Sequence, residues 1–236
     1  MRARLITYRG VPWLVLLVVS LLVTSARAAR NRPRASRRAA SQEAPAVPLS
    51  DIHVFGDRPA PFALDAKSAM MVDQQTGAVL YSYNEHARMQ PASLAKIMTF
   101  YLVLDALAQK RITLDTMMPI SEQAWRLSMD ESVSRMFLGV GQKVAVRDLL
   151  FGLMVSSGND AAVALSEYLG GSADGFTTQM NAKAAAVGLG ETHFTNPDGL
   201  PVEGEYTTAA DMVKLGCDLL RHHPEALTYT GAKDFT

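Results

Sequence analysis

The sequence predicts an α+β fold, in which a cluster of helices packs on an antiparallel sheet. Two short runs, 68–73 and 78–83, have the composition of strands, and the connection 74–77 ends in a glycine, which is typical of a hairpin. From residue 91 onward the apolar positions recur at helical spacing instead. Two strands followed by a run of helices place the chain in the α+β class.

The first 50 residues differ in composition from the rest of the chain. Residues 1–28 have the layout of a secretory signal, with a basic start, the apolar run 11–23 and a small-x-small cleavage site at Ala26-Arg27-Ala28. Residues 29–50 are rich in Arg, Ala, Ser and Pro, which predicts a basic disordered linker. We therefore expect an exported protein whose folded body is 51–236. If the signal is not cleaved, it would remain as an N-terminal anchor.

The net charge of zero hides an uneven distribution. Residues 51–236 hold 14 Lys and Arg against 22 Asp and Glu, whereas residues 29–50 hold five Arg and one Glu. An acidic body argues against nucleic acid as a substrate. The basic linker could contact anionic membrane or envelope polymers, and a plain spacer is the alternative. The single Cys217 cannot form an intramolecular disulfide, so one hydrophobic core must stabilise the body.

Amphipathic helices follow from apolar residues at i, i+3, i+4 and i+7. They are expected at 146–154, 161–169, 176–187 and 208–220. Thr208-Ala-Ala-Asp211 resembles a capping box at the start of the last of them. A weaker, short helix is predicted at 121–127, and Asn196-Pro-Asp-Gly199 is a turn by composition.

The segment 97–104 is apolar nearly all round, which predicts a helix buried in the middle of the domain. It opens with Ser93 and, three positions on, Lys96, so both side chains should lie on one helical face. A desolvated lysine loses proton affinity and can act as a general base toward a neighbouring hydroxyl. The alternative is that Ser93 is only an N-cap and Lys96 extends to solvent.

A second group of polar residues, Ser157-Gly-Asn159, lies in the tight connection between two predicted helices. Such a loop can project polar side chains into the centre of a domain. Ser, Gly and Asn are also ordinary turn residues, and Asn159 or Asp160 could simply cap the second helix. The combination of this loop with Ser93 and Lys96 favours a catalytic site.

These motifs together resemble the serine D-alanyl-D-alanine carboxypeptidases, the low-molecular-mass penicillin-binding proteins, from about Ala66 to the end of the chain. The matching segments are Pro91-Ala-Ser-Leu-Ala-Lys96, Gly141-Gln-Lys-Val, Ser157-Gly-Asn-Asp-Ala161, Gly188-Leu-Gly, Thr192-His-Phe194 and Asp198-Gly-Leu200. The family groups S-x-x-K, S-x-N and K-T-G motifs around one cleft. The resemblance implies a β-lactamase/transpeptidase-like domain without a cofactor, with peptidoglycan stem peptides as substrates and β-lactams as covalent inhibitors.

The resemblance also assigns roles to individual residues. It implies that Ser93 is the nucleophile that forms an acyl-enzyme and that Lys96 takes its proton. Ser157 would relay a proton to the leaving D-alanine, and Asn159 would bind an amide of the substrate. The backbone N–H of Ser93, near a helix N-terminus, could serve as one oxyanion donor.

The chain departs from the family pattern because it contains no Lys-Thr-Gly. In the family this motif lies on a sheet strand that borders the cleft. We therefore expect 51–236 to be a partial catalytic domain that lacks its C-terminal strands. The 236-residue chain itself is then expected neither to fold stably nor to hydrolyse D-Ala-D-Ala. It would be either a fragment of a longer reading frame, with a Lys-Thr-Gly some thirty-odd residues beyond Thr236, or the product of a truncated gene.

Three other functions remain open at this point. A DD-endopeptidase shares all of these motifs. A class A β-lactamase usually has Asp where Gly158 stands, and Glu167, the nearest glutamate that could assist deacylation, falls on the surface of the predicted 161–169 helix. A non-catalytic paralogue would bind stem peptides without turnover. The five histidines lack H-E-x-x-H or any other metal-binding spacing, so no metal is expected.

Overall fold

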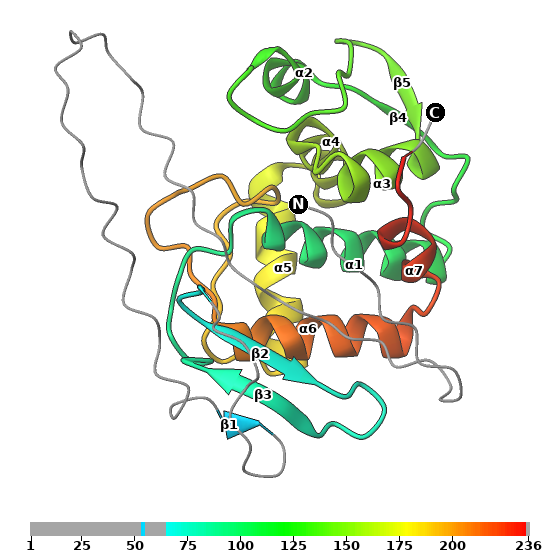
Figure 1. Cartoon of the computed structure of the whole chain (residues 1–236). Coiled ribbons are helices and arrows are strands. Elements are labelled where there is room, and N and C mark those ends of the chain that lie inside the picture. Colours follow the sequence, from blue (N-terminus) through cyan, green and yellow to red (C-terminus); the bar gives the residue numbers. More distant parts are fainter. Residues whose placement is uncertain (1–52, 55–64, 235–236) are drawn as a thin grey trace, which may run out of the picture. The chain divides into compact units, whose positions relative to one another are not determined.

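The computed structural model describes residues 53–54 and 65–234 (Figure 1). These residues divide into a sheet unit that ends at Glu85 and a helical unit that begins at His86. The predicted signal at 1–28 and the basic linker at 29–50 lie outside the described residues. Within the described ranges, no helix is both long enough and apolar enough to cross a bilayer.

The sheet unit contains the predicted hairpin and one further strand. Strands β2 (Ala69–Val72) and β3 (Val79–Tyr83) pair antiparallel, which confirms the hairpin. The short strand β1 (His53–Val54) pairs with the other edge of β3, so the order is β1-β3-β2. β1 was not predicted, because two residues are too few to produce an alternating pattern.

The helical unit confirms every predicted helix and adds two elements. Its helices are η2 (Ala92–Leu94, a 3-10 turn), α1 (Ala95–Ala108), α2 (Glu122–Met129), α3 (Val146–Val155), α4 (Asn159–Gly170), α5 (Ala173–Val187), α6 (Ala209–His222) and α7 (Ala226–Thr230). The added elements are α7 and the antiparallel pair β4 (Met117–Pro119) and β5 (Lys143–Ala145). All are short, so their sequences carry little periodic signal.

Helix α1 runs through the core of this unit. It contacts α3, α4, α5 and α6, and ten of its 14 residues are buried. Two of the buried residues are polar, Lys96 and Thr99. The α helix itself begins at Ala95, so the prediction that it opens at Ser93 was wrong by one short turn: Ser93 lies in the 3-10 turn η2 that precedes it.

Local capping explains where the other helices begin and end. The side chains of Ser121, Ser172 and Thr208 accept N-terminal hydrogen bonds of α2, α5 and α6. Thr208 accepts from the Asp211 backbone N–H, as predicted. The Asp211 carboxylate does not complete the predicted box, because its Oδ2 accepts from the Glu191 backbone N–H and the Thr192 hydroxyl.

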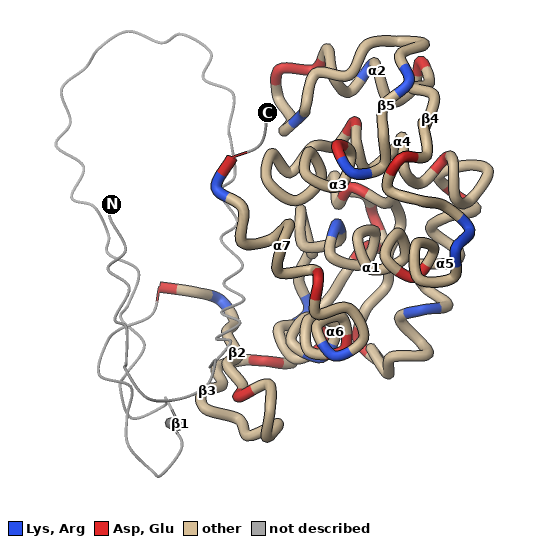
Figure 2. Tube along the Cα trace, turned by 90° about the vertical axis from the view of Figure 1, so that its right-hand side faces the viewer, with Lys and Arg blue, Asp and Glu red and all other residues tan. Residues whose placement is uncertain are grey.

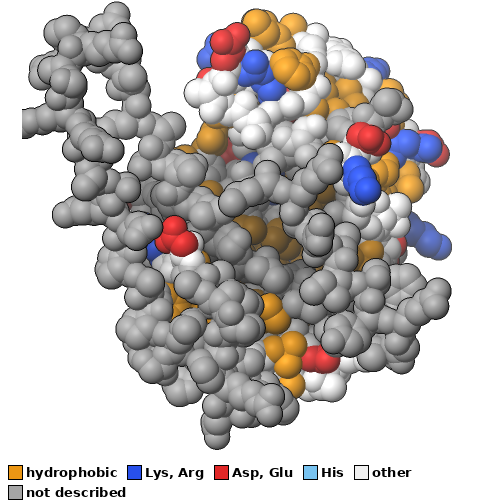
Figure 3. Space-filling model, in the orientation of Figure 1, with side chains coloured by type: hydrophobic (Ala, Val, Ile, Leu, Met, Phe, Trp, Pro, Cys, Tyr) orange, Lys and Arg blue, Asp and Glu red, His pale blue; other side chains and the backbone are white. Residues whose placement is uncertain are grey.

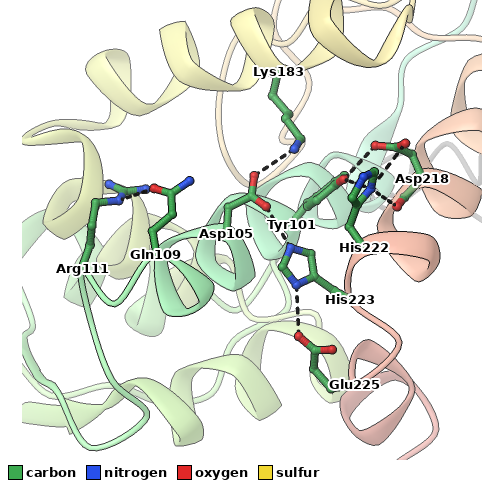
Figure 4. Close-up of polar contacts among 9 residues, drawn as sticks. All are labelled: Tyr101, Asp105, Gln109, Arg111, Lys183, Asp218, His222, His223 and Glu225. Carbon is green, nitrogen blue, oxygen red and sulfur yellow. Dashed lines mark hydrogen bonds and ion pairs between the residues drawn. The ribbon is translucent and has the colours of Figure 1, made fainter.

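A dense polar cluster, which we call the Asp105 cluster, joins the C-terminal half of α1 to α5, α6 and the segment before α7 (Figure 4). Asp105 bonds Lys183 at 2.9 Å and Nε2 of the buried His223 at 2.8 Å. The Tyr101 hydroxyl donates to Asp218 at 2.7 Å, and the Lys183 ammonium lies 3.8 Å from the centroid of the Tyr101 ring. Every ionisable group of the cluster therefore has a polar partner.

Acidic and basic residues are interspersed along the chain of the helical unit (Figure 2). Hydrophobic side chains also reach the surface around α2 and β5 (Figure 3). Exposed large apolar residues of that region include Met117, Met129, Phe137 and Val140. In the ranges 53–54 and 65–234, no group of three or more His, Cys, Asp or Glu residues is arranged to hold a metal ion.

Candidate active site

Ser93 and Lys96 are in contact, as their spacing predicts. Ser93 is exposed in the 3-10 turn, whereas Lys96 is 3% exposed in the first turn of α1. The Lys96 ammonium nitrogen lies 3.3 Å from the Ser93 hydroxyl oxygen. The two alternative interpretations do not hold, because Ser93 accepts no capping hydrogen bond and Lys96 does not extend to solvent.

Lys96 is held by a carbonyl rather than by a carboxylate. Its Nζ donates to the backbone oxygen of Asp198 at 2.6 Å, and in the described part of the chain it forms no ion pair. Burial lowers the pKa of Lys96 to about 8, against the opposing charges of Asp198, Asp160 and Glu205. This pKa leaves a minor but usable neutral fraction of Lys96 near neutral pH, and the neutral amine is the form that acts as a general base.

The turn 196–200 packs closely against the start of α1 and so fixes the position of Lys96. The Thr99 hydroxyl donates to the Pro197 carbonyl at 2.6 Å, next to the bond from Lys96 to Asp198. Gly199 has φ +77°, and a Cβ built there would lie 1.8 Å from the Ala92 carbonyl oxygen. Only glycine permits this approach, so the predicted turn has a specific role: it carries the carbonyl that orients Lys96.

Ser157 lies in the turn between α3 and α4, as predicted, whereas Asn159 is the first residue of α4. Ser157 has φ +53°, an uncommon conformation for a residue with a side chain. Asn159 is 4% exposed, its backbone N–H donates to the Ser134 carbonyl, and its Oδ1 has no hydrogen-bond partner in the described part of the chain. Neither side chain is hydrogen-bonded to Ser93 or Lys96 there, so the structure joins the two motifs through packing of α1 on α3 and α4.

Asp160 has a larger role than the helix cap that the sequence offered as an alternative. Its buried carboxylate accepts from the Ser128 hydroxyl at 2.6 Å and from the backbone N–H groups of Met136, Leu138 and Ala161. The bonds to Met136 and Leu138 anchor the loop on either side of Phe137, which has φ +63° and is 74% exposed. Asp160 thus fixes the loop that borders Asn159.

Glu205 is the residue that sequence reasoning missed most completely. It is 5% exposed, and neither carboxylate oxygen has a hydrogen-bond partner in the described part of the chain. Burial raises the pKa of Glu205 to about 7; the Thr195 backbone N–H opposes this shift without reaching hydrogen-bond geometry. A glutamate in a polar loop gives no sign of burial in the sequence, so no local pattern could have identified it.

Comparisons with known proteins identify the family of the chain. A family model described as D-alanyl-D-alanine carboxypeptidase matches residues 56–236. D-alanyl-D-alanine carboxypeptidase DacF of Bacillus subtilis is 40% identical over 177 residues, which cover 75% of this chain and 44% of that protein. The chain therefore spans less than half the length of this curated relative.

Solved structures show the same fold. Penicillin-binding protein 5 from Haemophilus influenzae is 39% identical with a TM-score of 0.71, over 75% of this chain and 51% of that one. Penicillin-binding protein D2 from Listeria monocytogenes, solved with cefotaxime bound, is 31% identical with a TM-score of 0.66, over 74% of this chain and 70% of that one. The predicted α+β, transpeptidase-like fold is confirmed, and the chain belongs to the D-alanyl-D-alanine carboxypeptidase family.

Proposed function

We propose that the protein is a serine-type D-Ala-D-Ala carboxypeptidase that removes the terminal D-alanine of peptidoglycan stem peptides through an acyl-enzyme on Ser93. The observation that carries this proposal is the contact between the exposed Ser93 hydroxyl and the buried Lys96 amine. Family membership supports the same reaction class. A lysine whose pKa is lowered to about 8 is suited to deprotonate a neighbouring serine near neutral pH.

The acylation step assigns a task to each predicted residue. Ser93 Oγ attacks the carbonyl carbon of the penultimate D-alanine while its proton passes to Lys96 Nζ. The C–N bond to the terminal D-alanine then breaks, and Ser157 relays a proton to the leaving amine. Asn159 has a buried, unpartnered Oδ1, which supports its predicted role in binding a substrate amide. Water subsequently hydrolyses the Ser93 ester.

The same nucleophile accounts for the proposed reaction with β-lactams. Penicillin-binding protein D2 from Listeria monocytogenes, a relative at 31% identity, was solved with cefotaxime bound. A β-lactam places a strained amide where the stem peptide places its scissile bond, so attack by Ser93 opens the ring and leaves an ester. We propose that export through residues 1–28 brings the site to the periplasm, and that the Arg-rich arm 29–50 contacts anionic envelope polymers.

Acylation by penicillin tests the proposal directly. The protein is expressed from the complete reading frame that contains these 236 residues, incubated with penicillin and analysed by intact-mass and peptide mass spectrometry. A single adduct on the peptide that contains Ser93 is expected, and Ser93→Ala should abolish it. Ser132→Ala, at an exposed serine in the loop after α2, is the matched control and should keep the adduct. No adduct, or an adduct that survives Ser93→Ala, would refute the proposal.

The fate of the adduct separates the remaining candidates. Slow loss of the penicilloyl group supports a carboxypeptidase, whereas rapid loss with turnover identifies a β-lactamase. Defined muropeptides then distinguish release of free D-alanine from cleavage of a cross-link by an endopeptidase. Specific binding of stem peptides without acylation of Ser93 would identify a non-catalytic member of the family.

A further inference from the structure

The segment that carries Glu205 is fixed from two sides. The backbone of Thr207 exchanges two hydrogen bonds with Met89, at 2.9 and 2.8 Å, four residues before Ser93. The backbone of Tyr206 pairs in the same way with His193. Glu205 therefore precedes a doubly bridged segment and has little freedom to turn its side chain outward.

Glu205 is one of three buried ionisable residues whose charges act on one another. One of the three, Lys96, contacts Ser93. Lys96, Asp198 and Glu205 are 3%, 4% and 5% exposed. The charges of Asp198 and Glu205 act on Lys96, and those of Asp198 and Lys96 act on Glu205. From α4, the carboxylate of Asp160 also acts on Lys96. These are the charged groups that face the amine.

The three carboxylates differ in how their charge is stabilised. The Asp160 carboxylate accepts hydrogen bonds from four donor groups. Asp198 accepts one, from the Leu200 backbone N–H at 3.0 Å. Glu205 accepts none from the described residues. A buried carboxylate without hydrogen-bond donors is protonated more easily than one that accepts hydrogen bonds. Of these three carboxylates, Glu205 is therefore the one whose charge changes most readily.

We propose that Glu205 is a positioning residue, and that its buried carboxyl group controls through its charge when Lys96 is free to accept the Ser93 proton. The inference rests on the proposed role of Lys96 as the base. An ionised Glu205 stabilises the ammonium form of Lys96, and a protonated Glu205 leaves the amine easier to deprotonate. Glu205 and Lys96 then titrate as a coupled pair.

Titration of Lys96 by nuclear magnetic resonance tests this without requiring turnover. The protein is labelled with lysine carrying ¹³C at the ε carbon, and the Lys96 signal is assigned by its loss in Lys96→Arg. We expect this signal to titrate with a midpoint near pH 8, below the ordinary lysine value of 10.5. We also expect a second, smaller inflection near pH 7 that reports the ionisation of Glu205.

Three variants separate a charge effect from a structural one. Glu205→Gln should remove the second inflection and lower the Lys96 midpoint by on the order of half a pH unit. Glu205→Asp keeps the carboxyl group and should retain two inflections. Glu203→Gln, at an exposed glutamate in the same loop, should change neither feature.

Two results would overturn the inference. One is a Lys96 signal that lacks the second inflection in the unmodified protein. The other is a midpoint that stays the same in Glu205→Gln, whether or not that variant is less stable to urea. Because no substrate or inhibitor is involved, a failure here leaves the acylation test of Ser93 unaffected, and a failure of that test leaves the titration interpretable.

Discussion

Buried ionisable groups have few partners at one end of helix α1 and many at the other. At the N-terminal end, Lys96 donates to a serine hydroxyl and a carbonyl, and Glu205 nearby has no hydrogen-bond partner in the described part of the chain. At the C-terminal end, Asp105 bonds both Lys183 and His223, and His223 in turn bonds Glu225 (Figure 4). Ionisable groups therefore lack ion-pair partners at the N-terminal end, within the described residues, and have them at the C-terminal end.

This difference indicates that the N-terminal end of α1 is suited to proton transfer and that the C-terminal end stabilises the fold. A buried group without an opposite charge loses solvation that no partner replaces, so its charged form is disfavoured and its proton becomes mobile. A paired group keeps its charge and holds helices together. Substitutions at the two ends should therefore have effects of opposite sign on stability.

The largest effect is expected for Lys96→Met. Removal of a general base should slow penicillin acylation of Ser93 about 10²–10⁴-fold. The free energy of unfolding at pH 7 should nevertheless rise, by on the order of 1 kcal/mol. The reason is that the variant no longer has to bury an ammonium group when it folds. Stopped-flow acylation and urea denaturation measure the two quantities. Lys143→Met, at an exposed lysine on β5, is the control and should leave both unchanged.

The opposite sign is expected for Asp105→Ala. This change leaves the half-buried Lys183 without its carboxylate and the buried His223 with Glu225 alone. It should lower the free energy of unfolding by about 2–3 kcal/mol. Urea denaturation at pH 7 provides the measurement. Asp115→Ala breaks the exposed ion pair with Arg147 and should cost less than about 0.5 kcal/mol. Equal losses in the two variants would contradict the contrast between paired and unpaired charges.

The pH dependence of the free energy of unfolding should also report the raised pKa of Glu205, near the N-terminal end of α1. The pKa of Glu205 is raised from 4.5 to about 7, so the folded state binds more protons than the unfolded state between these values. This contribution is fully present below pH 4.5 and is lost as the pH rises through about 7. The loss, on the order of 2 kcal/mol, should disappear in Glu205→Gln and persist in Glu203→Gln. Urea denaturation at a series of pH values measures it.

Lys96 produces the reverse slope at higher pH. Its pKa is lowered from 10.5 to about 8, so its destabilising effect is fully present below pH 8 and is relieved between these values. A single minimum of stability near pH 7 to 8 is therefore expected. A monotonic profile through this range would show that the two groups are not buried together.

The smallest effect is expected for Tyr101→Phe. The Tyr101 hydroxyl donates to Asp218 and lies 3.0 Å from Nδ1 of His222, and its loss should cost about 1 kcal/mol of unfolding free energy. The ring keeps its contact with Lys183, which limits the damage. Thermal and urea unfolding detect a change of this size. Tyr168→Phe, at a tyrosine that is 46% exposed, should be neutral.

The sequence was sufficient for those parts of the fold that depend on local patterns. The hairpin, the helices longer than two turns and the contact between Ser93 and Lys96 follow from residue periodicity, and each is confirmed. The catalytic roles of Ser93, Lys96, Ser157 and Asn159 stay predictions, supported by family membership rather than by a bound substrate.

What the sequence could not provide are contacts between distant residues. Lys96 meets the Asp198 carbonyl 102 positions later, and Asp105 meets His223 118 positions later. The burial of Glu205 depends on backbone bridges to Met89 and His193, which no local window contains. These residues carry ordinary loop or helix compositions, so only the folded chain distinguishes them.

Gly199 has a consequence for how such a protein can change over evolutionary time. Its backbone fills the space against Ala92 that any side chain would need, and it sits one residue from the carbonyl that holds Lys96. Every non-synonymous mutation of this codon would displace the carbonyl and the nucleophile together. Gly199 is therefore expected to stay fixed in any descendant of this sequence that keeps Lys96 in contact with Ser93.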